Sequence, residues 1–292
     1  MIQSVAVVGS GFMGGGIAQV SATAGHRVTL IDVDEHALAR GMDAIRWSVE
    51  KLANKGAITE HAETVLARFT TSSDFSAAKD ADLVIEAVYE DMAVKREVFT
   101  RLDGICKPEA ILASNTSTIP ITTLADSTKR PSQVIGLHFF GPVPLMRLVE
   151  VIMAKETTEA VLEDCLAYVK GLPKNPVVVR KDIPGFLMNR VFGAMVVEAM
   201  RLVEDGAGTA EDIDRGMCDG FNMRLGPIAI ADAAGLDITL NAFTIMNSLE
   251  PDRFQKCPAL LEKLVAQGRL GRKTGEGFYR WDSEGRIVGP AF

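Results

Sequence analysis

Short apolar runs alternate with helical patterns along the first part of the chain. The runs predict buried strands at residues 2–8, 26–31, 83–88, 110–114, 134–137, 147–153 and 176–179. Apolar residues at helical spacing predict helices at residues 17–24, 34–54, 59–68, 92–105 and 156–170. Strands and helices in alternation are typical of a doubly wound sheet, so the predicted fold class is α/β.

Two helical patterns follow one another without a strand between them, at residues 34–54 and 59–68, with a break at Gly56. Residues 34–68 are more than the chain needs to cross from one parallel strand to the next. We therefore expect a helical hairpin within residues 34–68 that projects from the sheet.

The alternation ends where Asp182-Ile183-Pro184 resembles a helix start, and the next 20 or so residues are apolar at helical spacing. Further helices are predicted after the capping-box sequence at Thr209 and over residues 225–249, before a hairpin-like tail at residues 277–289. The sequence therefore predicts a sheet domain over residues 1–182 and a helical domain over residues 183–292.

One predicted helix of the second domain carries a dense apolar group, made up of Met195, Val196, Val197 and Met200. Such a face packs either against a second copy of the chain or into the core of its own domain. The pattern alone leaves both alternatives open.

Composition and charge exclude several classes of protein. The chain of 292 residues is 47% hydrophobic, which is enough for about two buried cores. It has 31 basic and 38 acidic residues and a net charge of −7, so bulk nucleic-acid binding is not expected. No apolar run reaches the ~18 residues of a membrane span. The four cysteines are widely spaced, so we expect no metal site and a reducing, cytoplasmic location.

The pattern Gly9-x-Gly11-x-x-Gly14 stands between the first predicted strand and the first predicted helix. In a dinucleotide site the first glycine makes a tight turn, the second lets the backbone approach a pyrophosphate, and the third lets the helix pack closely. Phe12 and Met13 add side chains that we expect to face the cofactor cleft. The uncharged start of the chain also resembles a signal peptide, but it lacks a positive first region, and glycines interrupt its apolar stretch.

Asp32 follows the second predicted strand, a little over 20 residues after Gly9. An acid at this place accepts hydrogen bonds from the ribose hydroxyls of NAD and repels the 2′-phosphate of NADP. NAD is therefore the expected cofactor. The alternatives for Asp32 are a helix N-cap and a solvated strand end.

Several further segments occur together in one order, at residues 113–117 (ASNTS), 136–144 (GLHFFGPVP), 184–190 (PGFLMNR), 226–237 and 270–275. With the glycine turn they resemble the short-form L-3-hydroxyacyl-CoA dehydrogenases over nearly the whole chain. The resemblance implies reversible, NAD-dependent oxidation of an (S)-3-hydroxyacyl-CoA to the 3-oxoacyl-CoA in fatty-acid metabolism. The expected architecture is a Rossmann-type domain followed by a helical domain, and the expected partner is a second copy of the chain, bound through the helical domain.

The resemblance assigns catalytic roles to His138, Glu150, Ser117 and Asn189. His138 is the expected base, because a neutral imidazole can accept the proton of the C3 hydroxyl near pH 7. Glu150 is expected to hold its tautomer and to stabilise the imidazolium, whereas Ser117 and Asn189 position the substrate oxygen. Without the resemblance Glu150 reads as a surface acid, Ser117 as a helix N-cap, and Asn189 as an ordinary helical residue.

The resemblance also carries over the ligand-binding positions. Ser48 and Lys55 are expected to contact the nucleotide part of CoA, and on one helix they lie about two turns apart. The alternative for Lys55 is a solvated helix face. The residues expected near NAD, besides the glycine turn and Asp32, are Glu90, Lys95, Ser117 and Lys273.

One position departs from the family pattern, since the usual H-F-F-N-P reads His138-Phe139-Phe140-Gly141-Pro142 here. Gly141 lacks the side-chain amide of the family's asparagine. Two hypotheses follow: slower turnover, or room at Gly141 for a bulkier acyl group. The rival functions are a dehydrogenase of the same family that uses a 3-hydroxy acid without CoA, and an NAD-binding protein without turnover.

Overall fold

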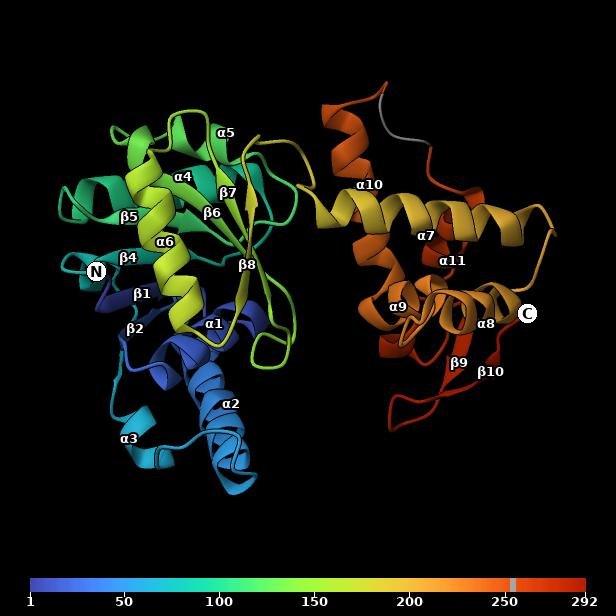
Figure 1. Cartoon of the computed structure of the whole chain (residues 1–292), viewed down its shortest axis with the longest axis horizontal. Helices are drawn as coiled ribbons and strands as arrows, with labels where there is room; N and C mark the ends of the chain where they lie inside the picture. The colour runs from blue at the N-terminus through green and yellow to red at the C-terminus, as the bar shows by residue number, and fades with distance from the viewer. Residues whose placement is uncertain (253–255) are drawn as a thin grey trace. The chain divides into compact units, whose positions relative to one another are not determined.

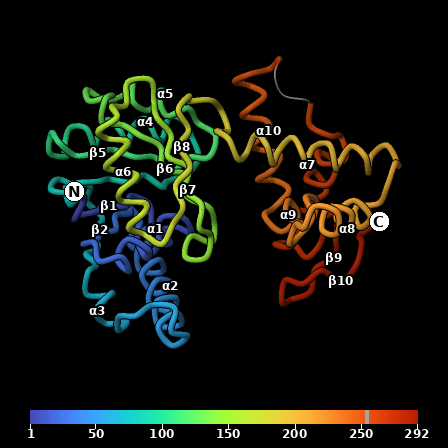
Figure 2. Tube along the Cα trace, viewed as in Figure 1, coloured from blue at the N-terminus to red at the C-terminus, as the bar shows by residue number. Residues whose placement is uncertain are grey.

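The computed structural model describes residues 1–252 and 256–292. The chain divides into two compact units, Met1–Ile183 and Pro184–Phe292, one residue from the expected boundary. Figure 1 shows a sheet with helices in the first unit and mainly helices in the second. The trace in Figure 2 completes the first unit before it enters the second, so each unit is one continuous segment.

The first unit, the sheet unit, is built on one eight-stranded sheet in the order β3-β2-β1-β4-β5-β6-β7-β8. Neighbouring strands are parallel except β6 and β7, which are antiparallel. The order of the first six strands is that of a Rossmann fold, which confirms the predicted class. The strands are β1 (Ser4–Val8), β2 (Arg27–Ile31), β3 (Phe69–Ser72), β4 (Leu83–Glu86), β5 (Ile111–Ser114), β6 (Val134–Phe139), β7 (Leu148–Met153) and β8 (Asn175–Val179).

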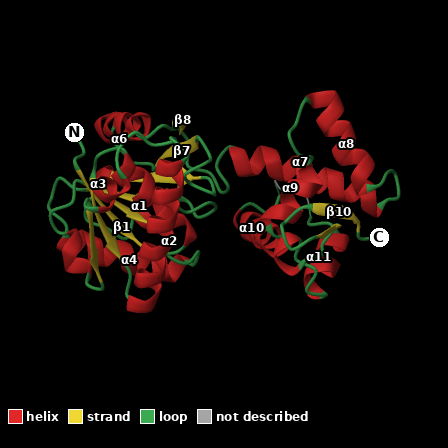
Figure 3. Cartoon of the chain, turned by 90° about the horizontal axis from the view of Figure 1, so that it is seen from below, coloured by secondary structure: helices red, strands yellow, loops and turns green. Residues whose placement is uncertain are grey.

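The central strands are buried along their whole length, and most of their side chains are apolar. Every residue of β4, β5 and β6 is buried. Because side chains alternate along a strand, such a run needs cover on both faces of the sheet. Figure 3 shows helices on both faces. The helices of this unit are α1 (Phe12–Thr23), α2 (Glu35–Asn54), α3 (Ala62–Leu66), α4 (Met92–Ile105), α5 (Ile121–Ala125) and α6 (Glu159–Gly171), with the 3-10 turns η1 (Phe75–Ala78) and η2 (Pro131–Gln133).

The sequence pattern does not predict β3. None of its residues is buried, and three of the four are threonine or serine. The strand lies at the edge of the sheet and pairs with β2. An exposed polar edge strand has no apolar run that would reveal it. The helix predicted over residues 59–68 is also too long, because α3 spans only Ala62–Leu66.

The predicted helical hairpin is present as α2 and α3. The helix α2 buries Leu38, Ile45 and Val49 in the core of the sheet unit. Figure 1 shows that α2 and α3 continue beyond the sheet, so the hairpin projects as expected.

The second unit, the helical unit, is helical with a terminal hairpin, as predicted. Val196, Val197 and Met200 of α7 are buried within this unit, which supports the alternative of an intradomain core. Thr209 caps α8 by accepting a hydrogen bond from the Asp212 N–H at 3.0 Å. The elements are α7 (Met188–Glu204), α8 (Ala210–Phe221), α9 (Pro227–Ala234), α10 (Leu236–Leu249), α11 (Ala259–Ala266), η3 (Arg272–Thr274), β9 (Tyr279–Trp281) and β10 (Ile287–Pro290).

A buried carboxylate joins α9 to the terminal hairpin. Asp232 is fully buried and accepts hydrogen bonds from the backbone N–H groups of Phe278 and Tyr279 and from the indole N–H of Trp281, at 2.8, 3.1 and 2.7 Å. Burial raises the pKa of Asp232, although the three donors offset part of this effect. The sequence motif over residues 226–237 therefore has a structural role in this unit.

Candidate active site

His138 and Glu150 face each other across the antiparallel strands β6 and β7. The two residues are direct partners in the strand register, which places their side chains on the same face of the sheet. His138 Nδ1 lies 2.7 Å from Glu150 Oε2, and the side chains are 7% and 0% exposed. The surface-acid alternative for Glu150 is therefore wrong.

This pairing determines the chemistry that the imidazole can perform. A carboxylate oxygen accepts, so the hydrogen bond places the proton of a neutral imidazole on Nδ1 and leaves Nε2 as the basic nitrogen. The ring of Phe140 packs against the imidazole, with the ring centroids 4.5 Å apart. The site therefore holds a histidine in one orientation and one tautomer beside a buried carboxylate.

The glycine turn has the geometry that a dinucleotide requires. Gly9 has a φ of +103°, and a Cβ on it would lie 2.5 Å from the carbonyl oxygen of Ala87. A Cβ on Gly14 would lie 1.8 Å from the carbonyl oxygen of Gly9, whereas one on Gly11 would meet nothing within 4 Å. Gly11 is also the N-cap of α1, where unpaired N–H groups favour an anion. The residues present therefore fit a pyrophosphate.

Asp32 is held beside the glycine turn by Ser10. The backbone N–H and the hydroxyl of Ser10 donate to Asp32 Oδ2 at 2.8 and 2.7 Å. The residue that caps α2 is Asp34, which accepts from the His36 N–H at 2.8 Å, so the N-cap alternative for Asp32 is wrong. Asp32 thus follows β2 with its carboxylate oriented toward the turn.

A buried charge network lies at the carboxyl ends of β4 and β5. Lys95 is 1% exposed, and its Nζ lies 2.7 Å from Glu86 Oε1 and 3.2 Å from Glu90 Oε2. Partial burial raises the pKa of Glu90, but the Lys95 ammonium and the neighbouring donors outweigh it, and the net pKa is lowered. Glu90 is therefore held as a carboxylate, and it shapes the loop that carries Ser117.

The Ser117 loop is held by this network. The backbone N–H of Ser117 donates to Glu90 Oε1 at 3.1 Å, and the hydroxyl groups of Thr116 and Thr118 donate to the same oxygen at 2.5 and 3.1 Å. The N-cap of α5 is Pro120, so the N-cap alternative for Ser117 is wrong. The expected cofactor residues Glu90 and Lys95 thus lie in one network with Ser117.

Glu86 was not among the expected site residues. It is fully buried and accepts from Lys95 Nζ, from Ser114 Oγ and from the Val88 N–H, each at 2.7 Å. An acid inside an otherwise apolar strand is the signal that could have identified it, because an acid is rarely buried without a partner.

Two expected site residues belong to the helical unit. Asn189 is the second residue of α7 and is half-buried. Lys273 lies in η3, with its Nζ 2.5 Å from Asp237 Oδ2. Their contacts with substrate and cofactor stay predictions.

The two expected CoA residues lie on the projecting hairpin. Ser48 is half-buried on α2, and Lys55 is the exposed C-cap residue of that helix. Next to Ser48, Trp47 is 62% exposed, and Lys51 Nζ lies 4.3 Å from the centroid of its ring. This face of α2 therefore presents cations and an aromatic ring.

The space beside Gly141 is occupied by the glycine turn. A Cβ on Gly141 would lie 2.7 Å from Cε1 of Phe12 and 3.3 Å from Sδ of Met13. The expectation that Gly141 leaves room for a bulkier acyl group is therefore wrong for this side of the residue. Phe12 and Met13 fill the room instead, although Phe12 stays 72% exposed.

Replacing Gly141 with asparagine is expected to raise the KM for NAD about fivefold. The added side chain displaces the exposed ring of Phe12, which begins α1 beside Gly11, so we expect the effect to come from a shift of the turn that holds the pyrophosphate. Steady-state kinetics measure the effect. Gly104→Asn is the matched control, because a Cβ on Gly104 meets nothing within 4 Å. An unchanged KM for NAD in the Gly141 variant contradicts the prediction.

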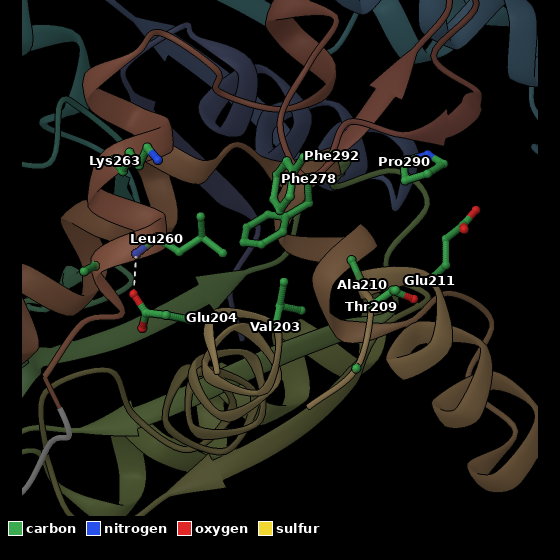
Figure 4. Close-up of a pocket in the computed structure, with 12 residues that line it drawn as sticks. Val203, Glu204, Thr209, Ala210, Glu211, Leu260, Lys263, Phe278, Pro290 and Phe292 are labelled. Carbon is green, nitrogen blue, oxygen red and sulfur yellow. Dashed lines mark hydrogen bonds between the residues drawn. The ribbon is translucent and has the colours of Figure 1, made fainter. Parts of the chain in front are cut away.

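A separate cavity of about 540 Å³ lies in the helical unit. Figure 4 shows the rings of Phe278 and Phe292 close together between Leu260 and Pro290, and Glu204 accepting a hydrogen bond from the Leu260 N–H at one edge. None of the expected site residues lines this cavity, so it adds nothing to the candidate active site.

The described residues show neither a single membrane-spanning helix nor a grouped set of metal ligands. Over residues 1–252 and 256–292, no single helix is long and apolar enough to cross a membrane. In that part of the chain only α9 and α10 taken together reach such a length and apolar character, and they are bent by 98°. Within the same residues no three histidine, cysteine or acidic side chains are grouped as metal ligands.

Comparison with known proteins covers both units. Residues 4–183 match the family model of the 3-hydroxyacyl-CoA dehydrogenase NAD binding domain, and residues 185–281 match that of the C-terminal domain. A probable 3-hydroxybutyryl-CoA dehydrogenase of Bacillus subtilis is 43% identical over 285 residues, which cover 97% of this chain and 99% of that protein. The mitochondrial hydroxyacyl-coenzyme A dehydrogenase of Sus scrofa is also 43% identical, over 96% of this chain and 92% of its own.

A solved structure supports the same assignment. The (S)-3-hydroxybutyryl-CoA dehydrogenase of Ralstonia eutropha is 38% identical and superposes with a TM-score of 0.92 over 97% of this chain and all of its own. The glycine turn and the family model that matches residues 4–183 agree on the cofactor. The chain therefore belongs to the 3-hydroxyacyl-CoA dehydrogenase family, and it is an NAD-dependent oxidoreductase.

Proposed function

We propose that the protein catalyses the reversible oxidation of an (S)-3-hydroxyacyl-CoA to the 3-oxoacyl-CoA, with His138 as the general base. The observation that carries the proposal is the 2.7 Å contact between His138 Nδ1 and the buried Glu150 Oε2. Two bacterial relatives are named 3-hydroxybutyryl-CoA dehydrogenases, which favours a short acyl chain. A role in fatty-acid β-oxidation accords with this substrate class.

His138 and Glu150 act together during oxidation. His138 Nε2 accepts the proton of the C3 hydroxyl, and the resulting imidazolium is stabilised by the carboxylate of Glu150. Bound NAD supplies the hydride acceptor for the C3 hydrogen. In the reverse direction His138 returns its proton to the oxygen of the reduced product. Ser117 and Asn189 position that oxygen.

The residues around the glycine turn hold the cofactor. The N–H groups at the start of α1 bind the pyrophosphate, and the backbone at Gly11 lets it approach. Asp32, held by Ser10, accepts from the adenosine ribose and selects NAD over NADP. Glu90, Lys95 and Lys273 complete the cofactor site.

The exposed face of α2 binds the nucleotide part of CoA. Ser48 and Lys55 contact its phosphates, and Lys51 adds a second cation on the same helix. A few local lysines suffice for one phosphorylated ligand, so the net charge of −7 is no obstacle. The substrate is therefore a CoA ester rather than a free acid.

A homodimer through the helical unit, in the cytoplasm, completes the proposal. Val191 and Leu202 of α7 are 69% and 38% exposed in the single chain, in contrast to the buried side of the same helix. Exposed apolar residues on a helix favour a contact with a second copy.

The test is oxidation of NADH in the presence of acetoacetyl-CoA, followed by absorbance, with free acetoacetate and NADPH as parallel arms. We expect turnover with acetoacetyl-CoA and NADH, and a kcat/KM at least about a hundredfold lower in the other arms, because each removes a charged or hydrogen-bonded recognition contact. Equal kcat/KM for the free acid would establish the rival dehydrogenase without CoA. No turnover in any arm would establish the rival NAD-binding protein.

A further inference from the structure

Asn115 lies at the carboxyl end of β5, between the strand that ends with Glu86 and the strand that carries His138. Its backbone N–H donates to the carbonyl oxygen of Glu86 at 2.8 Å. Strands β4, β5 and β6 are parallel, so their carboxyl ends meet at one edge of the sheet. Ligands of open α/β sheets bind at this edge. Asn115 therefore stands at the edge that binds the dinucleotide.

The orientation of the Asn115 amide is fixed by a backbone donor. The N–H of Phe139, the residue after His138, lies 2.9 Å from Asn115 Oδ1. A backbone N–H can only donate, so the atom that faces it must be the carbonyl oxygen of the side chain. The amide nitrogen, Nδ2, is consequently turned away from Phe139 and keeps its two N–H donors for another partner.

That partner is not another side chain of the sheet unit. Within residues 1–252 and 256–292, the side chain of Asn115 makes one hydrogen bond, the one from Phe139. Asn115 is half-buried. In the described residues, the enclosed side-chain atoms that lack a partner are Asp237 Oδ1 and Arg269 Nε, so Nδ2 of Asn115 is not enclosed. Its amide donors are therefore open to the solvent or to a ligand.

The strand order indicates which part of the cofactor lies there. In a sheet of order 3-2-1-4-5-6, one half of the dinucleotide lies on each side of the crevice beside β1. Asp32 follows β2, so the adenosine half lies over β2 and β1. The nicotinamide half then lies over β4 and β5, and Asn115 is two strands from the glycine turn, about 10 Å at the usual spacing.

We propose that Asn115 is a cofactor-binding residue, whose Nδ2 donates a hydrogen bond to an uncharged oxygen of the nicotinamide riboside of NAD. Its Oδ1 meanwhile holds the backbone next to His138. One side chain thus joins the cofactor to the strand end that carries the base. The proposal rests on the NAD dependence of the family and not on the identity of the acyl substrate.

The test compares Asn115→Asp with Asn115→Ala by calorimetric titration with NADH. Aspartate keeps an oxygen for the Phe139 N–H but has no amide donor, whereas alanine loses both groups. We expect the Kd for NADH to rise about tenfold in both variants, since one hydrogen bond to a ligand is worth about that factor. The midpoint of thermal unfolding of the aspartate variant is expected to stay near that of the wild type.

Two controls separate the lost donor from the added charge. Gln133→Glu makes the same amide-to-carboxylate change in η2, at the opposite end of β6, and is expected to leave the Kd unchanged. The loss of affinity for NADH in Asn115→Asp is expected to persist at about 0.5 M salt, where repulsion between the added carboxylate and the cofactor is largely screened. Wild-type affinity in Asn115→Asp, or a loss that disappears at high salt, overturns the proposal. Because no acyl-CoA is present, either result stands independently of the proposed reaction.

Discussion

Replacing His138 with glutamine is expected to lower kcat about a thousandfold while the Kd for NADH stays within about twofold of the wild type. Glutamine fills a similar space, but it has no nitrogen that accepts a proton near neutral pH. A positioned acid or base contributes roughly 10² to 10⁴ to the rate, and His138 is the proposed base. The measurements are steady-state kinetics with acetoacetyl-CoA and calorimetric titration with NADH.

The matched control for this variant is His61→Gln, the same substitution at an exposed position of the projecting hairpin. It is expected to leave kcat unchanged. A kcat near the wild-type value in His138→Gln contradicts the proposed base. A large loss of NADH affinity in that variant would instead assign His138 to the cofactor site.

Replacing Glu150 with glutamine is expected to lower kcat about a hundredfold or more with a much smaller change in the KM for acetoacetyl-CoA. The side-chain amide still offers an oxygen to His138 Nδ1, but it lacks the charge that stabilises the imidazolium. The charge matters here because Glu150 is fully buried, so water does not screen it. Steady-state kinetics in both directions measure the effect.

The control for Glu150 is Glu163→Gln, on the exposed side of α6. The thermal unfolding midpoint of Glu150→Gln is measured in parallel, because removal of a buried hydrogen-bonded charge also destabilises the fold. If a folded Glu150→Gln variant retains kcat within about threefold of the wild type, Glu150 has no part in the reaction.

Much of the fold could be predicted because its central strands are short, mostly apolar runs. The runs at β1, β2, β4 and β5 and the glycine turn after β1 give the doubly wound class directly. The edge strand β3 was not predicted because it buries no side chain and so has no apolar run. Such a strand is specified by its pairing with β2, which is a property of the fold and not of the local pattern.

The site could be predicted in part. The glycine turn and Asp32 follow from spacing, whereas the contact of His138 with Glu150 depends on the reversal of direction between β6 and β7. No pattern of apolar and polar residues reports that reversal, and only the resemblance joined the two residues. Glu86 and Asn115 escaped prediction because their roles lie in hydrogen bonds to neighbouring strands.

The sequence at Gly141 does not reveal whether the missing side chain leaves open space. From the sequence, the loss of a side chain indicates open space. In the folded chain Phe12 and Met13, more than 120 residues earlier, occupy that space. A volume change is therefore interpretable only with its spatial neighbours.

The most direct test of the proposed reaction is the transfer of deuterium from NADH to acetoacetyl-CoA. The wild-type protein is incubated with acetoacetyl-CoA and NADH deuterated at the transferable position of C4, and the product is analysed by mass spectrometry and chiral chromatography. We expect (S)-3-hydroxybutyryl-CoA with a single deuterium at C3. Unchanged acetoacetyl-CoA, or a reduced product without deuterium at C3, would contradict the proposed hydride transfer.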